Sequence, residues 1–260
     1  KTVGFDGRVM SYQEVARLSN KLITDVDLVD EVWSERPSIS HEPAFIYDEE
    51  YCGESRASKL ARLRSAMGDC QHHIITSLDD IVWLFNIRGN DVDCNPVVLS
   101  YALINQDNAI LYVQDNVVDV KTEAILKRDS IIIRAYNDIY EDVKKLTGKV
   151  LLDDQIVNYQ IFNNLNCEIK TAPNPTQHFK AIKNETEIKA TKNAHIKDGV
   201  AMTKFMYWLK NNVGKIELDE VTISDKLAAF RKEQNEFFDL SFDTICGYKA
   251  NAALMHYKAE

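Results

Sequence analysis

Histidine is the side chain of this sequence best suited to acid–base or metal chemistry, because imidazole changes its charge near neutral pH and also binds metal ions. His256 ends an apolar run close to the C-terminus and is followed directly by Tyr257. This position predicts a histidine at the point where a strand leaves a core. From its position alone, a satisfied histidine at a strand end is the favoured interpretation.

The other histidines are weaker candidates. His72 and His73 are expected to begin a strand, one pointing inward and one outward, and no carboxylate three or four residues later completes a metal site. His195 lies in a predicted helix, where a structural role is favoured. His41 and His178 lie near prolines and are expected to be exposed. These five histidines therefore predict no metal-ligand set.

Two further polar stretches could carry chemistry. Asp79 and Asp80 are adjacent, and we interpret them as the N-terminus of a helix rather than as an acid pair. The run Arg88–Asp91 is either a solvent-exposed loop or a rim contact of a substrate cleft. Within it, Gly89 is expected to supply a backbone conformation that a residue with a Cβ atom would resist.

Composition and missing motifs exclude several classes of protein. The net charge of −9 and the scattered Lys and Arg residues argue against a nucleic-acid partner. No apolar run approaches the ~20 residues of a membrane-spanning helix, so no membrane partner is expected. No Gly-rich phosphate loop, GxSxG elbow or HExxH helix occurs. The five cysteines are far apart, which fits neither a disulfide framework nor a zinc site and predicts a reduced, cytoplasmic protein.

An internal repeat indicates how the chain is organised. The segment from Val3 to Gln13 aligns with the segment from Val150 to Gln160, because valine, aspartate, a β-branched residue, tyrosine and glutamine recur at a constant spacing. Each copy is expected to form a strand ending in aspartate, a turn, and a helix that opens near Ser11 or Asn158. The repeat predicts two copies of one αβ domain in tandem, with most of the first copy lying upstream of Lys1.

Proline-containing connectors divide the remaining elements, one between Trp33 and Pro43 and one at Ala172–Pro175. Between them the periodicity predicts helices over 55–67, 81–85 and 137–146, and strands over 72–76, 97–104, 109–113 and 130–134. The cap of the helix over 81–85 is expected in Ser77–Asp80.

The region beyond Pro175 is expected to be strongly helical. A helix from Asn184 to about Asn212 is predicted to end before Gly214, and a second from Asp219 or Thr222 to about Glu236. The long helix is expected to bury five apolar residues, Ile188, Ala194, Val200, Phe205 and Trp208. Two β-like runs, 237–244 and 252–257, follow.

Three stretches, Trp83–Pro96, Lys180–Trp208 and Phe237–Tyr257, resemble the long, three-domain Xaa-Pro aminopeptidases (aminopeptidase P) of the creatinase or pita-bread metallopeptidase family. The last contains a Ser-Phe-Asp-Thr-Ile sequence, an Asn-Ala-Ala sequence and the His-Tyr pair that includes His256. Many family members have Gly-Pro where this chain has Lys249-Ala250.

The resemblance implies an α/β fold. Creatinase N-terminal-like domains, with mixed sheets flanked by helices, would be followed by the start of a pita-bread α+β catalytic domain. On this basis residues 1–45 are the C-terminal end of a first such domain, 46–174 are the second, middle domain, and 175–260 are the N-terminal portion of the catalytic domain.

The resemblance also implies an activity, namely release of the N-terminal residue from peptides with proline at position two. In the family, hydroxide activated by two manganese ions attacks the peptide bond. The family histidine that matches His256 contacts bound substrate and stabilises the tetrahedral intermediate. The metal ligands, two aspartates, a histidine and two glutamates, would lie beyond residue 260, so the chain alone is expected to be inactive. The intact protein is expected to form a homodimer.

The sequence leaves two other functions open. A peptidase-like protein-binding module would keep the fold and lose the metals, and the retained His256-Tyr257 pair argues against it. An amidinohydrolase of the creatinase type is disfavoured by the middle domain.

Overall fold

The computed structural model describes residues 1–259, which form two units. Residues 1–92 and 96–183 belong to the first unit, and residues 93–95 and those from 184 onward belong to the second. Each unit has its own packing.

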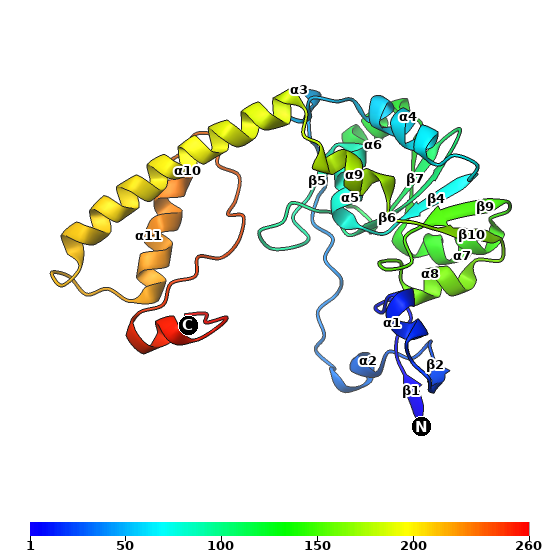
Figure 1. Cartoon of the computed structure of the whole chain (residues 1–260), viewed down its shortest axis with the longest axis horizontal. Helices are drawn as coiled ribbons and strands as arrows, with labels where there is room; N and C mark the ends of the chain where they lie inside the picture. The colour runs from blue at the N-terminus through cyan, green and yellow to red at the C-terminus, as the bar shows by residue number, and fades with distance from the viewer. Residues whose placement is uncertain (260) are drawn as a thin grey trace. The chain divides into compact units, whose positions relative to one another are not determined.

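A mixed six-stranded sheet forms the centre of the first unit, in the order β10-β9-β4-β6-β7-β8 (Figure 1). Strand β6 pairs antiparallel with β4 and β7, whereas β4–β9, β9–β10 and β7–β8 are parallel. The strand bounds are β4 (His72–Ile75), β6 (Ser100–Asn105), β7 (Ala109–Val113), β8 (Ile131–Ala135), β9 (Lys149–Leu152) and β10 (Glu168–Thr171). This arrangement confirms the predicted α/β class with a mixed sheet.

Helices cover both faces of this sheet. Alternate residues of each strand point to opposite faces, so both faces present apolar side chains that the helices bury. In β6, Ala102 and Ile104 join one apolar cluster, whereas Tyr101 and Leu103 join another. The first cluster includes residues of α4, α5 and α6, and the second includes residues of α7 and α8. The helix bounds are α4 (Arg56–Ala66), α5 (Leu78–Phe85), α6 (Val120–Arg128), α7 (Ile139–Asp142), α8 (Tyr159–Asn164) and α9 (Pro175–Ala181).

Several predicted elements of this unit are confirmed, and others need correction. The helix over 55–67 and the strands near 72–76, 109–113 and 130–134 are present, and β6 begins three residues later than predicted, at Ser100. The helix over 137–146 is instead the short α7 between two 3-10 turns (Tyr136–Asp138 and Val143–Lys145). Helix α5 begins after Ser77, but that hydroxyl makes no cap hydrogen bond. Helices α6 and α9 were not predicted.

The N-terminal residues form a small β-α-β-α segment, namely β1 (Thr2–Gly4), α1 (Tyr12–Ala16), β2 (Lys21–Ile23) and α2 (Leu28–Val32). A short antiparallel pair, β3 (Phe45–Ile46) with β5 (Ile87–Arg88), and the helix α3 (Glu49–Cys52) follow the connector.

The sequence repeat is present in the structure as a repeat of local conformation. Strands β1 and β2 pair in parallel from Thr2↔Lys21, and the equivalent strands β9 and β10 pair in parallel from Lys149↔Glu168. The aspartate that follows each first strand, Asp6 or Asp153, accepts a hydrogen bond from the backbone N–H two residues later. Ser11 and Asn158 both cap the helix that follows, each accepting from the third helical N–H.

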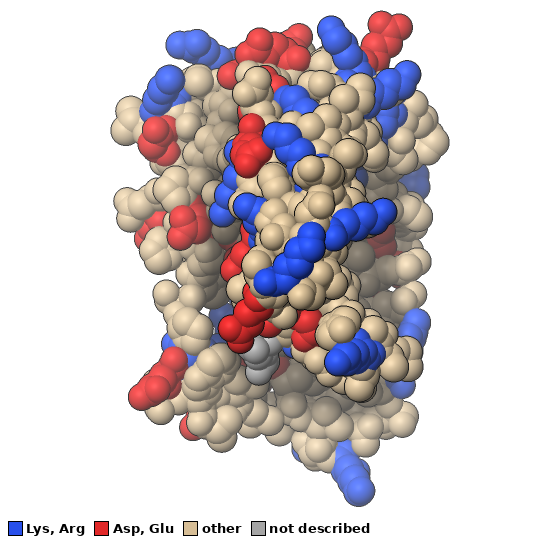
Figure 2. All heavy atoms as spheres, turned by 90° about the vertical axis from the view of Figure 1, so that its left-hand side faces the viewer, with Lys and Arg blue, Asp and Glu red and all other residues tan. Residues whose placement is uncertain are grey.

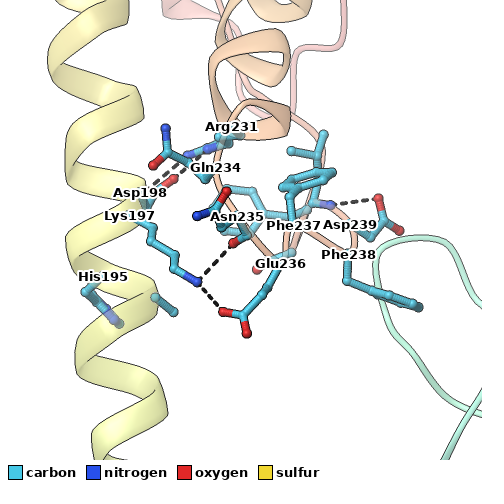
Figure 3. A pocket seen from close by; sticks show the side chains of 14 residues that line it. His195, Lys197, Asp198, Arg231, Gln234, Asn235, Glu236, Phe237, Phe238 and Asp239 are labelled. Atoms are coloured by element: carbon cyan, nitrogen blue, oxygen red, sulfur yellow. Dashed lines mark hydrogen bonds and ion pairs between the residues drawn. The ribbon is translucent and has the colours of Figure 1, made fainter.

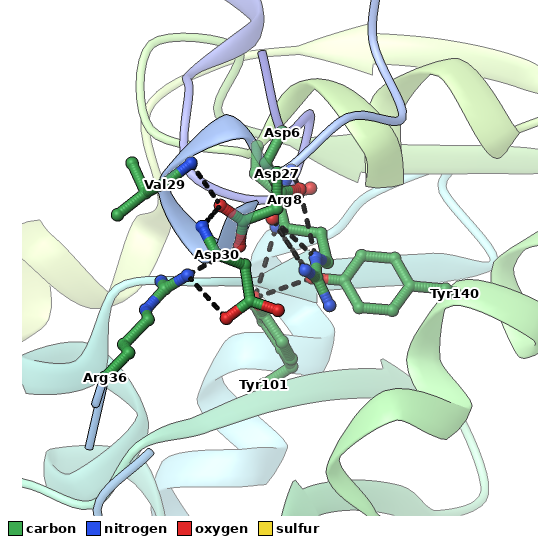
Figure 4. A network of polar contacts seen from close by, with 9 residues as sticks. Asp6, Arg8, Asp27, Val29, Asp30, Arg36, Tyr101 and Tyr140 are labelled. Atoms are coloured by element: carbon green, nitrogen blue, oxygen red, sulfur yellow. Dashed lines mark hydrogen bonds and ion pairs between the residues drawn. The ribbon is translucent and has the colours of Figure 1, made fainter. Parts of the chain in front are cut away.

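The two copies also contact one another through symmetric hydrogen bonds. Tyr12 N–H donates to the carbonyl of Val157 at 2.9 Å, and Tyr159 N–H donates to the carbonyl of Met10 at 2.8 Å. Beside this contact, the rings of Tyr12 and Phe162 stack with centroids 3.5 Å apart. Figure 4 shows the ion pairs near the first copy, Asp6 with Arg8 and Asp27 with Arg36.

The second unit is built on two helices, α10 (Glu185–Asn212) and α11 (Glu220–Lys232), as predicted. Asn184 and Glu187 form a capping box at the start of α10, and Asp219 caps α11. Ala201, Phe205 and Leu227 are the apolar residues buried between the helices. Ion pairs lie along the same contact, among them Asp198 with Arg231 and Lys204 with Glu233.

Two predictions for the second unit are wrong. Of the five residues expected to be buried in α10 only Phe205 is, whereas Ile188, Ala194 and Val200 are exposed and Trp208 is half-buried, because α11 covers only one side of α10. The runs 237–244 and 252–257 do not form strands. A strand requires a partner for its backbone hydrogen bonds, and no other strand exists in residues 184–259. The second run begins at the end of a short 3-10 helix, η3 (Lys249–Ala253).

The surface carries charges of both signs. Figure 2 shows one face of the molecule, on which Lys and Arg side chains are interspersed with Asp and Glu. Within residues 1–259, no helix has the length and apolar character needed to cross a membrane.

Candidate functional site

His256 lies on an exposed turn rather than at the end of a strand. It follows η3, and its backbone adopts a left-handed conformation with φ of 55°. Its side chain is exposed and has no hydrogen-bond partner among residues 1–259. The prediction that His256 lies where a strand leaves the core is therefore wrong. The exposed imidazole is nevertheless compatible with contact to a substrate.

A cluster of hydrogen bonds next to His256 fixes this turn. The Tyr257 hydroxyl donates to Oε2 of Glu220 at 2.6 Å, and the Asn251 side-chain amide donates to the same oxygen at 3.1 Å. The backbone N–H of Tyr248 donates to Oε1 of Glu220 at 2.6 Å. Glu220 is the first residue of α11, so one helix end holds the whole turn.

The electrostatics of the cluster follow from these bonds. The hydrogen bond from Tyr257 stabilises the ionised carboxylate and lowers the pKa of Glu220 below its usual value. The same bond raises the pKa of the Tyr257 hydroxyl, because ionisation of that group would place a second negative charge beside the carboxylate. Both groups therefore keep their donor and acceptor roles at neutral pH. The sequence predicted a helix start here, but it gave no signal that Glu220 contacts the turn.

A separate pocket of about 420 Å³ lies between α10 and the segment that follows α11 (Figure 3). Four of its charged side chains are paired, Lys197 with Glu236 at 2.6 Å and Asp198 with Arg231 at 2.6 Å, and Asp239 accepts a hydrogen bond from the backbone N–H of Leu240. His195 lines this pocket, and its Nδ1 lies 2.9 Å from the carbonyl of Thr191. His256 does not line the pocket, so the structure does not bring the two histidines together.

The adjacent histidines of β4 are not a reactive pair. His73 is fully buried, its Nδ1 lies 3.0 Å from the carbonyl of Leu151, and burial lowers its pKa to about 4, so the ring is neutral at pH 7. Burial also lowers the pKa of His72. His73 lies in the core of the first unit and His72 is only partly buried, in agreement with the predicted strand.

Asp80 lies in the first turn of α5, as predicted, and it also contacts two residues that are distant in the sequence. It is completely buried, lies 3.1 Å from the ammonium group of Lys180, and accepts a hydrogen bond from Asn174 at 3.2 Å. These two partners belong to α9 and its cap, so Asp80 joins α9 to α5 within the first unit. Its partners are far away in the sequence, which is why sequence reasoning missed this contact.

The Arg88–Asp91 loop is held by the protein itself. Arg88 donates to the carbonyl oxygens of Val82 and Ile87, and Asp91 accepts hydrogen bonds from Ser40, Glu42 and Leu99. Gly89 is required for space and not for an unusual φ. A Cβ atom there would lie 2.7 Å from the Val98 side chain and 3.1 Å from the carbonyl oxygen of Val97.

Residues 1–259 contain no group of three or more His, Cys, Asp or Glu side chains that could hold a metal ion. The exposed imidazole of His256 by itself does not amount to the set of carboxylate and imidazole ligands that a two-metal centre needs. The described residues therefore do not fit a metal centre by themselves.

Comparison with known proteins places the chain in a family. Residues 35–187 match the creatinase/prolidase N-terminal domain, and residues 189–260 match metallopeptidase family M24. Probable Xaa-Pro aminopeptidases P of Sordaria macrospora and Talaromyces marneffei are 34% and 35% identical over 100% of this chain, which covers 47% and 43% of their lengths. The chain thus spans less than half the length of these relatives.

Solved structures agree with the sequence matches. X-prolyl aminopeptidase from Caenorhabditis elegans, described as a cytosolic enzyme with a di-nuclear active site, is 28% identical, with a TM-score of 0.87 over 94% of this chain and 43% of that one. Xaa-Pro dipeptidase from Bacillus anthracis is 18% identical, with a TM-score of 0.50 over 69% of this chain and 49% of that one, and shares the fold. The resemblance inferred from the sequence is confirmed: this chain is similar along its whole length to Xaa-Pro aminopeptidases P, and it belongs to the creatinase/prolidase family, with a match to metallopeptidase family M24 after the N-terminal domain.

Proposed function

We propose that the whole protein to which this chain belongs is an Xaa-Pro aminopeptidase, which releases the N-terminal residue from peptides with proline at position two. The observation that carries the proposal is the agreement along the whole chain with probable Xaa-Pro aminopeptidases P, together with the TM-score of 0.87 to the C. elegans enzyme. The family match alone would leave other reactions of the creatinase fold open.

His256 is the residue of this chain assigned to the reaction. Its imidazole is exposed and has no hydrogen-bond partner in residues 1–259, and the turn that carries it is fixed through Tyr257 and Glu220. In the proposed role it contacts the bound peptide and donates a hydrogen bond to the oxyanion of the tetrahedral intermediate. Neutral imidazole is suited to that role because one ring nitrogen remains a donor near neutral pH.

The metal centre of the whole protein is proposed to hold two manganese ions. The M24 match and the di-nuclear site described for the C. elegans enzyme support two metals, and manganese is our choice of ion. Because residues 1–259 do not fit such a centre, its ligands are assigned to residues outside this chain.

The proposed domain organisation follows the resemblance to aminopeptidase P and agrees with the repeat. Residues 1–45 end a first creatinase N-terminal-like domain, 46–174 form the middle domain, and 175–260 open the catalytic domain. Helix α9 lies at this last boundary and packs with α4 and α5 in the first unit. We also propose a cytoplasmic homodimer, for which the cytosolic C. elegans relative supports the location.

Peptide hydrolysis by the whole protein tests this proposal. With Mn²⁺ present, the whole protein is expected to release arginine from Arg-Pro-Pro and to leave the control peptide Arg-Ala-Pro uncut. Residues 1–260 alone are expected to cleave neither peptide and to bind no stoichiometric Mn²⁺. Failure of the whole protein to cleave any Xaa-Pro peptide, with tight peptide binding retained, would support the protein-binding module instead.

A further inference from the structure

Glu220 accepts hydrogen bonds from both ends of the turn Tyr248–Tyr257, and no other described side chain is seen to do so. Its carboxylate accepts from the backbone N–H of Tyr248 at 2.6 Å and from the hydroxyl of Tyr257 at 2.6 Å. Between these two residues, the Asn251 amide donates to Glu220 at 3.1 Å and to the Tyr257 hydroxyl at 3.0 Å. One carboxylate therefore closes the turn that presents His256.

Apolar packing contributes little to the shape of this turn. Leu254 and Met255, the apolar residues nearest to His256, are 58% and 92% exposed. The backbone of His256 also adopts a left-handed φ of 55°, which is unfavourable for a residue with a Cβ atom and persists only where the surroundings impose it. The hydrogen bonds to Glu220 are the contacts on either side of His256 that can impose this conformation.

We infer that Glu220 is a positioning residue, which holds the His256 imidazole in place through the Tyr257 hydroxyl and the Tyr248 backbone. This inference rests on the proposed function, because it matters for catalysis only if His256 contacts the substrate. A carboxylate suits the task better than a neutral acceptor, since hydrogen bonds to a charged oxygen are shorter and stronger. The lowered pKa of Glu220 keeps it ionised at the pH of the reaction.

The consequence for catalysis is a matter of geometry. A group that donates to a developing oxyanion must be held close to its working position, and a small displacement reduces the rate strongly. Loss of the Glu220 carboxylate leaves His256 chemically unchanged but frees the turn. The expected defect is therefore a lower kcat with little change in KM.

Steady-state kinetics of the whole protein test the inference through a double-mutant cycle. Glu220→Gln is expected to lower kcat by about tenfold to a hundredfold. Tyr257→Phe removes one donor and is expected to have a smaller effect in the same direction. Glu217→Gln, at an exposed glutamate three residues earlier, serves as the matched control and is expected to leave kcat unchanged. In a His256→Ala background, Glu220→Gln is expected to add no further loss.

The possible outcomes separate this inference from the proposed function. If His256→Ala leaves the kinetics unchanged, the assigned role of His256 is wrong. If His256→Ala lowers kcat and Glu220→Gln does not, only the positioning role is overturned. The same conclusion follows if Glu220→Gln lowers kcat equally with and without His256, because the residue then acts on the fold as a whole.

A spectroscopic measurement keeps the test decisive if the variant of the whole protein folds poorly. In residues 1–260 labelled with tyrosine carrying ¹³C at Cζ, the Tyr257 resonance is expected to titrate at higher pH than that of an exposed tyrosine. Glu220→Gln is expected to return this titration towards the ordinary range, and Tyr257→Phe assigns the signal. An unchanged titration in Glu220→Gln would contradict the hydrogen bond on which the inference depends.

Discussion

The two units of this chain are stabilised in different ways. In the first, a six-stranded sheet is covered on both faces and the apolar side chains of its central strands are almost completely buried. In the second, two helices bury only a narrow strip of apolar residues, and α10 leaves Ile196 and Tyr207 67% and 74% exposed. The first unit therefore relies on its core, whereas the second relies on helix caps, ion pairs and hydrogen bonds.

This difference bears on function. The residue assigned to chemistry, His256, lies in the unit with little core, on a turn held by the single carboxylate of Glu220. The candidate residues of the first unit, His73 and Asp80, are buried and have structural contacts. In this chain the side chain proposed for the reaction is exposed on a turn that polar contacts hold, whereas the buried polar side chains maintain the fold.

The largest expected contrast concerns core deletions. Leu63→Ala removes a fully buried side chain of α4 and is expected to lower the free energy of unfolding of the first unit by about 3–5 kcal/mol. Val200→Ala, at a residue of α10 that is 44% exposed, is expected to cost about 0.5 kcal/mol or less. Hydrogen exchange read by mass spectrometry on peptides of each unit measures both. Equal losses would contradict the contrast between the units.

The next contrast is in pH dependence. The ordinary pKa of histidine is about 6.5, and burial lowers that of His73 to about 4 in the folded protein. The unfolded chain therefore binds a proton more readily, so stability is retained above pH 6.5 and is lost as the pH falls from 6.5 towards 4. The loss is expected to be on the order of 3 kcal/mol in the first unit.

Urea unfolding between pH 7 and pH 4.5 measures this loss. In His73→Gln the unfolding free energy is expected to fall less steeply over that range. His178→Gln, at an exposed histidine of α9, is the matched control and is expected to behave as the unmodified chain. An equally steep fall in His73→Gln would show that other groups cause the acid sensitivity.

Helix caps give a smaller contrast. Asn184→Ala removes the partly buried cap of α10 and is expected to cost about 1 kcal/mol. Asn158→Ala removes the cap of α8, and it also removes the amide donor of the buried Tyr101 and Tyr140 hydroxyls, so it is expected to cost more. Thermal unfolding of the two variants compares them, and a larger loss for Asn184→Ala would contradict this ranking.

The smallest expected effect is that of a surface ion pair. Asp198 and Arg231 join α10 to α11 with a separation of 2.6 Å, and the aspartate is half exposed. A double-mutant cycle to alanine is expected to give a coupling energy below about 1 kcal/mol, reduced further at high salt. A coupling of several kcal/mol would mean that the second unit depends on this pair far more than its exposure suggests.

Much of the fold could be predicted from local sequence. The long helix was predicted to within a residue at each end, because Asn184 and Glu187 form a capping box and Gly214 with φ of 76° lies just beyond the end. The repeat was recognisable because Asp6 and Asp153 form the same turn after a strand. Such signals act within a few residues, where the chain alone determines the outcome.

The rest depended on partners distant in sequence. Ile188 and Val200 have the helical spacing of buried residues, but burial requires a covering surface that the described residues do not provide. Asp80 was interpreted as part of a helix start and Glu220 was not singled out, and only the folded structure shows that they contact α9 and the His256 turn. The position of His256 was identified by resemblance to a family, but its exposed, left-handed turn was not predicted.

The kinetics of His256→Ala in the whole protein test the central claim most directly. With Arg-Pro-Pro as substrate and Mn²⁺ present, we predict that kcat falls by ~10²–10³-fold, the loss typical of an oxyanion donor. His41→Ala, at an exposed histidine of the connector, should leave kcat unchanged. Kinetics of His256→Ala equal to those of the unmodified protein would contradict the assignment of His256 to the reaction.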